Sequence, residues 1–161
     1  MNNLKPGFML STLLLIATNA HAGQYDKGGK PYILHPLKVM HYLKTDDEEL
    51  QCIALGHDLF EDTTVTASEL RSHGISERVI QGILALTKMP GECYEEYKNK
   101  VMGNIDAIKV KMQDLRHNCD IRRLKGVTDK DNRRIEKYHR FYLELQEALL
   151  SYKCQGSFEY R

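Results

Sequence analysis

Residues 52–62 read Cys-Ile-Ala-Leu-Gly-His-Asp-Leu-Phe-Glu-Asp, a mostly apolar segment interrupted by His57-Asp58 and then by Glu61-Asp62. The preceding residues, 45–49, combine a capping side chain with an acidic first turn and predict a helix that enters the core. Ionisable side chains are seldom buried at the end of a core segment unless they are paired or bind a metal. The segment therefore predicts a metal site with an acid/base pair beside it. The plainer alternative is a capped helix whose polar end faces solvent.

The composition is that of one soluble globular domain, with 161 residues, of which 42% are hydrophobic and 28% charged. A net charge of +1 gives no overall attraction to nucleic acid or to a membrane surface. No run approaches the ~18 apolar residues of a membrane span. The four cysteines have no zinc-finger spacing, and we expect Cys52 and Cys119 to be buried, reduced thiols.

The N-terminal apolar run, residues 8–17, allows two interpretations. Together with Lys5 and the triplet Ala20-His21-Ala22, it imitates a secretory signal with its cleavage site. Its apolar positions also fall on one helical stripe, as in an amphipathic helix of a globular domain. The stripe consists of Leu10, Leu13, Leu14, Ala17, Ala20 and His21. We interpret the run as the first helix of the domain and expect a cytoplasmic protein.

Helical spacing and capping signals recur along the rest of the chain, and no strand-like alternation stands out. A glycine-containing loop is expected at 24–32. Further helices are expected at 33–43, 45–62, 66–74, 76–86, 94–102, 105–118 and 129–150. The pattern predicts an all-α fold, a compact bundle of about six to eight helices over residues 1–150. A polar tail is expected at 151–161.

The candidate metal ligands lie at or near the ends of predicted helices, where a bundle can bring side chains to one point. They are His35, His57, Asp58 and Asp114. Two imidazoles and two carboxylates suit Mn²⁺, Fe²⁺, Co²⁺ or Zn²⁺ with open positions for water. Such an ion lowers the pKa of a bound water, roughly from 15.7 to about 7. Of Glu61 and Asp62, one could then orient or deprotonate that water while the other holds the geometry.

Four motifs occur in order along the chain. They are Ala20-His21-Ala22-Gly23-Gln24, Lys27-x-x-x-Pro31-Tyr32-Ile33-Leu34-His35-Pro36, His57-Asp58-x-x-Glu61-Asp62-Thr63 and Val110-Lys111-x-x-Asp114-Leu115-Arg116-His117-Asn118. With these motifs the chain resembles the HD-domain hydrolases of the RelA/SpoT type over about residues 10–145. It is most similar to the small single-domain members, a group that includes the metazoan SpoT homologue.

This resemblance implies an HD-domain helical fold and a Mn²⁺-dependent reaction. The reaction removes the 3′-pyrophosphate from guanosine tetra- and pentaphosphate. The family's metal ligands fall on His35, His57, Asp58 and Asp114, and its catalytic pair falls on Glu61 and Asp62. The substrate-binding residues that it implies are Lys27, Asn118, Arg134 and Tyr138.

The chain departs from the family pattern at two positions. Asp26 stands where the longer enzymes have an arginine, so a cation that could stack on a purine is missing. We therefore expect only modest discrimination between guanine and adenine. Arg116 is shifted by one position, which moves its charge to another helix face. The pairs Arg122-Arg123 and Arg133-Arg134 indicate a local polyphosphate pocket rather than a nucleic-acid surface.

Two alternatives to the alarmone hydrolase remain. One is another nucleotide phosphohydrolase, such as an NADPH 2′-phosphatase, and the other is a catalytically silent nucleotide-binding module. In each case the expected partner is a small nucleotide, not a nucleic acid or a membrane, and the sequence also allows a homo-oligomer. For His117 both a role in supporting the ligands and a purely structural role remain open.

Overall fold

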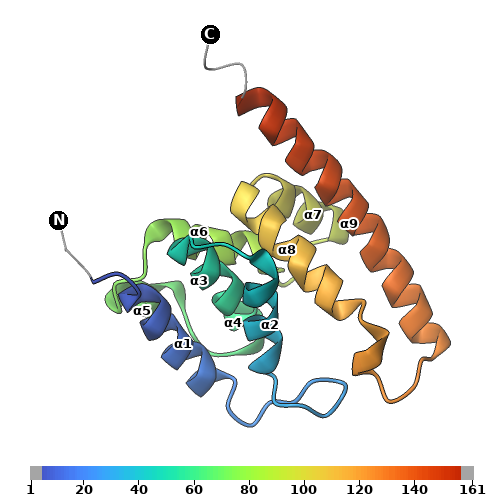
Figure 1. Cartoon of the computed structure of the whole chain (residues 1–161), viewed down its shortest axis with the longest axis horizontal. Helices are drawn as coiled ribbons and strands as arrows, with labels where there is room; N and C mark the ends of the chain where they lie inside the picture. Colours follow the sequence, from blue (N-terminus) through green and yellow to red (C-terminus); the bar gives the residue numbers. More distant parts are fainter. Residues whose placement is uncertain (1–4, 157–161) are drawn as a thin grey trace.

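The computed structural model describes residues 5–156, which form a bundle of helices (Figure 1). The elements are α1 (Phe8–Ala20), α2 (Leu34–Leu43), α3 (Glu48–Gly56), α4 (Leu59–Asp62), α5 (Ala67–Ser72), α6 (Glu77–Leu86), α7 (Tyr94–Met102), α8 (Ile105–Asn118), the 3₁₀ helix η1 (Ile121–Arg123) and α9 (Asp129–Gly156). Within residues 5–156 no strand forms beyond an isolated bridge between Tyr25 and Pro31. The all-α prediction is confirmed.

The segment that the sequence predicted as one helix over 45–62 is two helices. A turn at His57 and Asp58 separates α3 from α4. The His57 ring explains the break, because its Nδ1 lies 2.7 Å from the carbonyl oxygen of Ala54. In a continuous helix that carbonyl would accept the N–H of Asp58. The expected six to eight helices thus become nine α-helices within the described residues.

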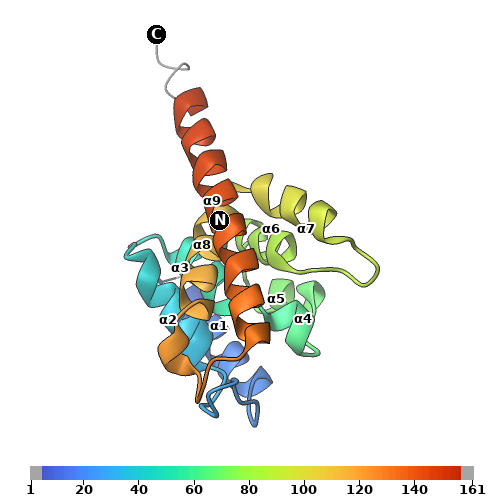
Figure 2. The same ribbon diagram turned by 90° about the vertical axis from the view of Figure 1, so that its right-hand side faces the viewer.

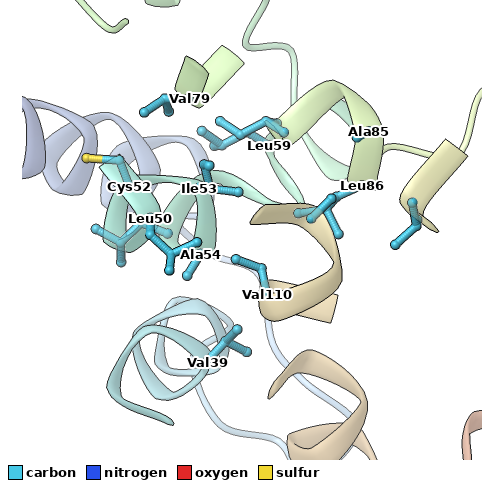
Figure 3. Close-up of a cluster of buried hydrophobic side chains, with 14 of the residues drawn as sticks. Val39, Leu50, Cys52, Ile53, Ala54, Leu59, Val79, Ala85, Leu86 and Val110 are labelled. Carbon is cyan, nitrogen blue, oxygen red and sulfur yellow. The ribbon is translucent and has the colours of Figure 1, made fainter. Parts of the chain in front are cut away.

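The core is built around α3, whose residues Cys52–Leu55 are at most 1% exposed. Figure 3 shows Val39 of α2, Leu86 of α6 and Val110 of α8 around Ile53 and Ala54 of α3. α3 and α6 approach each other closely, since a Cβ on Gly82 would lie 2.5 Å from Cδ1 of Ile53. Burial of each large aliphatic side chain contributes about 1.5–3 kcal/mol. This packing fixes α3, and with it the His57-Asp58 turn at its C-terminal end.

Side-chain caps begin most of the helices, as the sequence indicated. Asp47, Thr66 and Ser76 accept hydrogen bonds from backbone N–H groups of α3, α5 and α6. Asn104 caps α8 by accepting from the N–H groups of Asp106 and Ala107. Cys93 caps α7 with a reciprocal capping box. Each cap contributes about 1 kcal/mol and fixes where its helix starts.

The N-terminal apolar run forms α1, as predicted. Leu13 and Ala17 of the predicted stripe are fully buried against the core. The carboxylate of Glu48 on α3 accepts hydrogen bonds from the N–H groups of Gly7 and Leu10, both at 3.0 Å, and so anchors the start of α1. No helix in residues 5–156 is both long and apolar enough to cross a membrane.

The last helix, α9, lies along α7 and α8, and its C-terminal part extends past the other helices (Figures 1 and 2). The buried side chains of Phe141 and Leu145 lie on the face of α9 that packs against the core. The helix continues to Gly156, past the end predicted near Leu150. The other part of the predicted tail, residues 157–161, lies outside the described residues. The boundary between a domain at 1–150 and a tail remains a prediction.

Candidate active site

Four side chains from three parts of the chain meet at one point. His35 lies in the first turn of α2, His57 and Asp58 follow α3, and Asp114 lies near the end of α8. The Nε2 atoms of the two histidines are 3.2 Å apart. Oδ2 of Asp58 is 3.0 Å from Nε2 of His57 and 3.6 Å from Nε2 of His35. Oδ1 of Asp114 is 3.1 Å from Nε2 of His35 and 3.7 Å from Nε2 of His57.

This geometry suits a divalent metal ion. Ligand atoms about 2.0–2.2 Å from one ion lie roughly 3 Å from each other. His35, His57 and Asp58 offer ligand atoms within 4.8 Å of one another, so these residues can hold an ion. Asp114 has an oxygen within 3.7 Å of both imidazoles and is the predicted fourth ligand. We call these four residues the metal cluster.

The charges in the metal cluster favour a bound cation. Burial disfavours the protonated form of His57, but Asp58 and Asp114 outweigh burial and raise its pKa to about 10. Burial also opposes ionisation of both carboxylates. The imidazoles nevertheless hold the pKa of Asp58 well below its usual range, and Lys111 and the imidazoles do so for Asp114. Two ionised, largely buried carboxylates attract either a proton onto His57 or a metal ion.

Further contacts hold His35 and Asp58 in place. The Tyr32 hydroxyl donates a hydrogen bond to Oδ2 of Asp58 at 2.5 Å. On the far side of the His35 ring, Nδ1 lies 2.6 Å from Nδ1 of His117, and the two rings are stacked. Burial, Arg123 and His35 lower the pKa of His117 to about 4, so it is neutral at pH 7. Of the two roles left open for His117, the structure favours support of a predicted ligand.

Asp114 is held by two neighbours on its own helix. Asn118 donates from Nδ2 to Oδ1 of Asp114 at 2.6 Å, and Lys111 donates from Nζ to Oδ2 at 2.8 Å. Lys111 is largely buried, with a side chain that is 18% exposed. Asn118, predicted to bind substrate, therefore also positions a predicted metal ligand.

The predicted catalytic pair, Glu61 and Asp62, lies in α4 beside the metal cluster. Both residues are exposed, but partial loss of solvent around their carboxyl groups and the charge of Asp58 raise the pKa of each. The Glu61 side chain accepts a hydrogen bond from the N–H of Lys88. The backbone carbonyl of Asp62 accepts one from the Gln24 side chain at 2.9 Å. A carboxylate with a raised pKa is a better proton acceptor, as a general base requires.

A cavity of about 210 Å³, which we call the arginine cavity, adjoins the metal cluster. Tyr32 and Asn118 line it and contact Asp58 and Asp114, respectively. All four predicted substrate-binding residues also line it. Its lining includes Lys27, Tyr32, Asn118, Arg123, Arg134 and Tyr138.

Arg134 and Tyr138 lie one turn apart on α9, and both line the arginine cavity. Arg134 is held by an ion pair with Asp131 at 2.9 Å. Burial and the nearby Arg134 charge lower the pKa of Lys27. The two cations repel each other, so an anion between them would be stabilised.

Asp26, the residue that departs from the family pattern, brings another arginine to this cavity. Its Oδ2 accepts a hydrogen bond from Arg123 at 3.1 Å, and Arg123 also donates to the Asn118 side chain at 3.0 Å. The backbones are in close contact there too, since a Cβ on Gly28 would lie 2.4 Å from the carbonyl oxygen of Arg123. The loop at 24–32 is thereby joined to η1. Position 26 supplies no cation to this cavity, but Arg123 does.

The remaining arginines separate into two groups. Of the two predicted pairs, Arg123 and Arg134 line the arginine cavity, whereas Arg122 and Arg133 are exposed outside it. Arg116 packs its guanidinium 4.2 Å from the centroid of the Tyr42 ring. Its charge therefore lies on another helix face, as predicted.

The other histidines and the cysteines lie outside the metal cluster. His41, His73 and His139 are exposed, and His21 is buried with Nδ1 bonded to Gln24 at 2.8 Å. Cys52 is buried as predicted, whereas Cys119 is only partly buried. All four cysteines are free thiols.

No protein-family model matches the chain. It is 30% identical over 135 residues to the guanosine-3′,5′-bis(diphosphate) 3′-pyrophosphohydrolase of Haemophilus influenzae, which covers 76% of this chain and 20% of that protein. It is 31% identical over 137 residues to the bifunctional (p)ppGpp synthase/hydrolase SpoT of Escherichia coli K12, which covers 76% of this chain and 19% of that protein. The chain thus spans about a fifth of the length of these relatives.

A solved structure described as a metazoan orthologue of SpoT that hydrolyses ppGpp has the same fold. Its TM-score is 0.69 at 20% identity, over 96% of this chain and 98% of that chain. Over about three quarters of its length, the chain is similar to proteins named as (p)ppGpp 3′-pyrophosphohydrolases and SpoT.

Sequence reasoning missed several residues of this candidate active site. Tyr32 and Lys111 lie inside the quoted motifs, but no role was assigned to either. Both contact predicted metal ligands. The ion pair between Asp26 and Arg123 joins residues 97 positions apart, so no local pattern could have indicated it.

Proposed function

We propose that this protein removes the 3′-pyrophosphate from guanosine tetra- and pentaphosphate by metal-dependent hydrolysis. One observation carries the proposal: two imidazoles and two carboxylates converge beside an acid pair and a cavity lined by three cations, Lys27, Arg123 and Arg134. The likeness to proteins named as 3′-pyrophosphohydrolases supports the choice of substrate.

We assign the metal ligands to His35, His57, Asp58 and Asp114, with Mn²⁺ as the preferred ion. Fe²⁺, Co²⁺ or Zn²⁺ would suit the same nitrogen and oxygen donors. When bound, the ion supplies Lewis acidity, which activates water and neutralises phosphate charge.

Glu61 and Asp62 have separate roles in proton transfer from the attacking water. Glu61, with its raised pKa, takes a proton from the attacking water. Asp62 holds the geometry, since Gln24 ties its backbone to the loop at 24–32.

The arginine cavity binds the nucleotide. Lys27 and Arg134 hold phosphate charge, and Arg123, fixed by Asp26, adds a third cation. Tyr138 contacts the sugar or base with its phenol. Asn118 lines the same cavity while its amide positions Asp114. The partner is therefore a small nucleotide, and we place the reaction in the cytoplasm. Homo-oligomer formation remains a prediction.

A turnover screen tests the proposal. Purified protein loaded with Mn²⁺ should convert guanosine tetraphosphate to guanosine diphosphate and pyrophosphate. Removal of the metal by chelation should abolish this turnover, and added Mn²⁺ should restore it. The panel should include NADPH and adenosine nucleotides that carry a 3′-pyrophosphate. Turnover of NADPH alone would replace the proposed substrate. A full equivalent of bound metal with no turnover on the panel would indicate a silent binding module.

A further inference from the structure

A second cavity, of about 230 Å³, borders the metal cluster directly. We call it the lysine cavity. Its lining includes Asp58, Glu61, Lys88, Lys111, Lys137 and Tyr138. Tyr138 also lines the arginine cavity, so the two cavities adjoin at this side chain. A substrate lying past Tyr138 could therefore extend from one cavity into the other beside Asp58.

Three lysines from three different elements converge on the lysine cavity. Lys88 follows the end of α6, Lys111 lies in α8 and Lys137 lies in α9. Lys111 is committed to Asp114 by its hydrogen bond. Lys88 and Lys137 are exposed at the edge of the cavity. The cavity thus has one cation in its interior and two at its edge.

The two edge lysines differ from neighbouring lysines in their partners. Lys98 pairs with Glu144 and Lys100 with Glu92, both at 2.8 Å. Lys137 instead holds its ammonium 3.6 Å from the centroid of the Tyr94 ring. Within residues 5–156, neither Lys88 nor Lys137 forms an ion pair with a carboxylate. Their charges remain free to bind an anion.

We infer that the lysine cavity binds the terminal phosphate of the 3′-pyrophosphoryl group, an inference that rests on the proposed function. The nucleoside then occupies the arginine cavity, and the bond to be cleaved lies between the two cavities beside the metal cluster. Asp58 and Glu61 face the lysine cavity but belong to the metal cluster and the acid pair. Lys88 and Lys137 are the groups that contact the terminal phosphate.

The chemical step fits this arrangement. The oxygen of water forms a bond to the phosphorus next to the ribose, and the bond from that phosphorus to the ribose 3′-oxygen breaks. The electron pair stays on the 3′-oxygen, which takes up one proton, while the second proton of the water passes to base or solvent. The products are the nucleoside diphosphate and pyrophosphate, which carries the new oxygen. The lysines therefore hold the group that departs as pyrophosphate.

Binding of inorganic pyrophosphate tests the inference without turnover. Calorimetry on the Mn²⁺-loaded protein should compare wild type with Lys88→Gln and Lys137→Gln, both at exposed positions. Each variant should bind pyrophosphate about tenfold more weakly, the loss expected for one charge-assisted contact. Orthophosphate lacks the second phosphoryl group that the lysines are inferred to contact, so its affinity should change less than about threefold. Lys109→Gln is the matched control, because Lys109 is on α8 but outside the cavity.

In turnover of guanosine tetraphosphate, both lysine variants should raise KM by a similar factor with little change in kcat. Unchanged pyrophosphate affinity in both variants would overturn the lysine cavity assignment even if the wild type is active. The converse result is also informative. If the wild type binds pyrophosphate through these lysines but does not hydrolyse the tetraphosphate, the subsite stands and the proposed function fails.

Discussion

Glu61 and Asp62 are adjacent in α4, yet their surroundings give them different tasks. Glu61 lines the lysine cavity and accepts a hydrogen bond from the backbone of Lys88. Glu61→Gln keeps the shape but removes the base, so kcat should fall by about 10²–10⁴-fold. Metal content and the affinity for pyrophosphate should be retained. Glu69→Gln, an exposed change of the same chemistry on α5, should leave kcat unaltered.

If Glu61→Gln retained a rate within a few-fold of wild type, Glu61 would not be the base. The assignment would then pass to Asp62, whose pKa is also raised by burial and by Asp58.

His57 predicts how metal binding depends on pH. Because Asp58 and Asp114 raise its pKa to about 10, His57 is protonated at pH 7 when no ion is bound. Binding of Mn²⁺ must therefore release about one proton, and affinity should rise about tenfold per pH unit up to about pH 10. This window reaches well above the ordinary histidine range. The His57 ion pair stabilises the metal-free fold fully below pH 6.5 and loses that contribution as the pH rises through about 10.

Calorimetry in buffers with different ionisation enthalpies measures the released proton directly. His73→Gln, at an exposed site, should leave the number of protons released on metal binding unchanged. Binding without proton release at pH 7.5 would contradict the protonation state assigned to His57.

At the scale of elements, Arg78 of α6 connects three helices. It donates to Asp47 at the start of α3 at 2.7 Å, to Glu49 at 2.9 Å and to Asp106 of α8 at 2.8 Å. Asp106 is buried, and Arg78→Gln removes the guanidinium that pairs with its carboxylate. Because the arginine is 41% exposed, solvent screening limits the loss of unfolding free energy to about 1–2 kcal/mol.

The loss should also depend on pH. Hydrogen bonds from Arg78 hold the pKa of Asp47 below its usual range. The contribution is present above about pH 3.8 and disappears as the pH falls through the lowered value. In chemical denaturation, the difference in unfolding free energy between wild type and Arg78→Gln should be smaller at pH 3 than at pH 7. Arg71→Gln, which removes an exposed pair with Glu77, is the control with no resolvable loss. An equal difference in unfolding free energy at the two pH values would mean that protonation of Asp47 does not weaken its interaction with Arg78.

Elements were predictable from sequence where their determinants are local. Ser76 and the apolar spacing after it define α6, because a cap and a 3.6-residue period act within one helix. The break between α3 and α4 was not predicted, since it depends on how the His57 ring meets the Ala54 carbonyl. The metal cluster could be predicted because its residues lie within recognisable motifs. The lysine cavity could not, because Lys88 and Lys137 come to one cavity only through the tertiary fold, in which both α6 and α9 pack on α7 and α8.

At the scale of the whole molecule, α2 and α3 pack together with α8, and α9 lies along α8 (Figures 1 and 2). Tyr138 of α9 lines both the arginine cavity and the lysine cavity. The core around α3 positions His57 and Asp58, α2 and α8 add His35 and Asp114, and α9 closes both cavities. The metal cluster is largely buried, and of the cations proposed to bind the nucleotide Lys27 is exposed whereas Arg123 and Arg134 are partly buried. The arrangement assigns one cavity to each side of the bond to be cleaved.

Hydrolysis of guanosine tetraphosphate in ¹⁸O-labelled water tests this account most directly. With Mn²⁺-loaded protein, mass spectrometry of the products should find one ¹⁸O atom in the pyrophosphate and none in the guanosine diphosphate. That result requires attack of water on the phosphorus next to the ribose 3′-oxygen. Label in the guanosine diphosphate, release of orthophosphate in place of pyrophosphate, or no hydrolysis by the fully metal-loaded protein would contradict it.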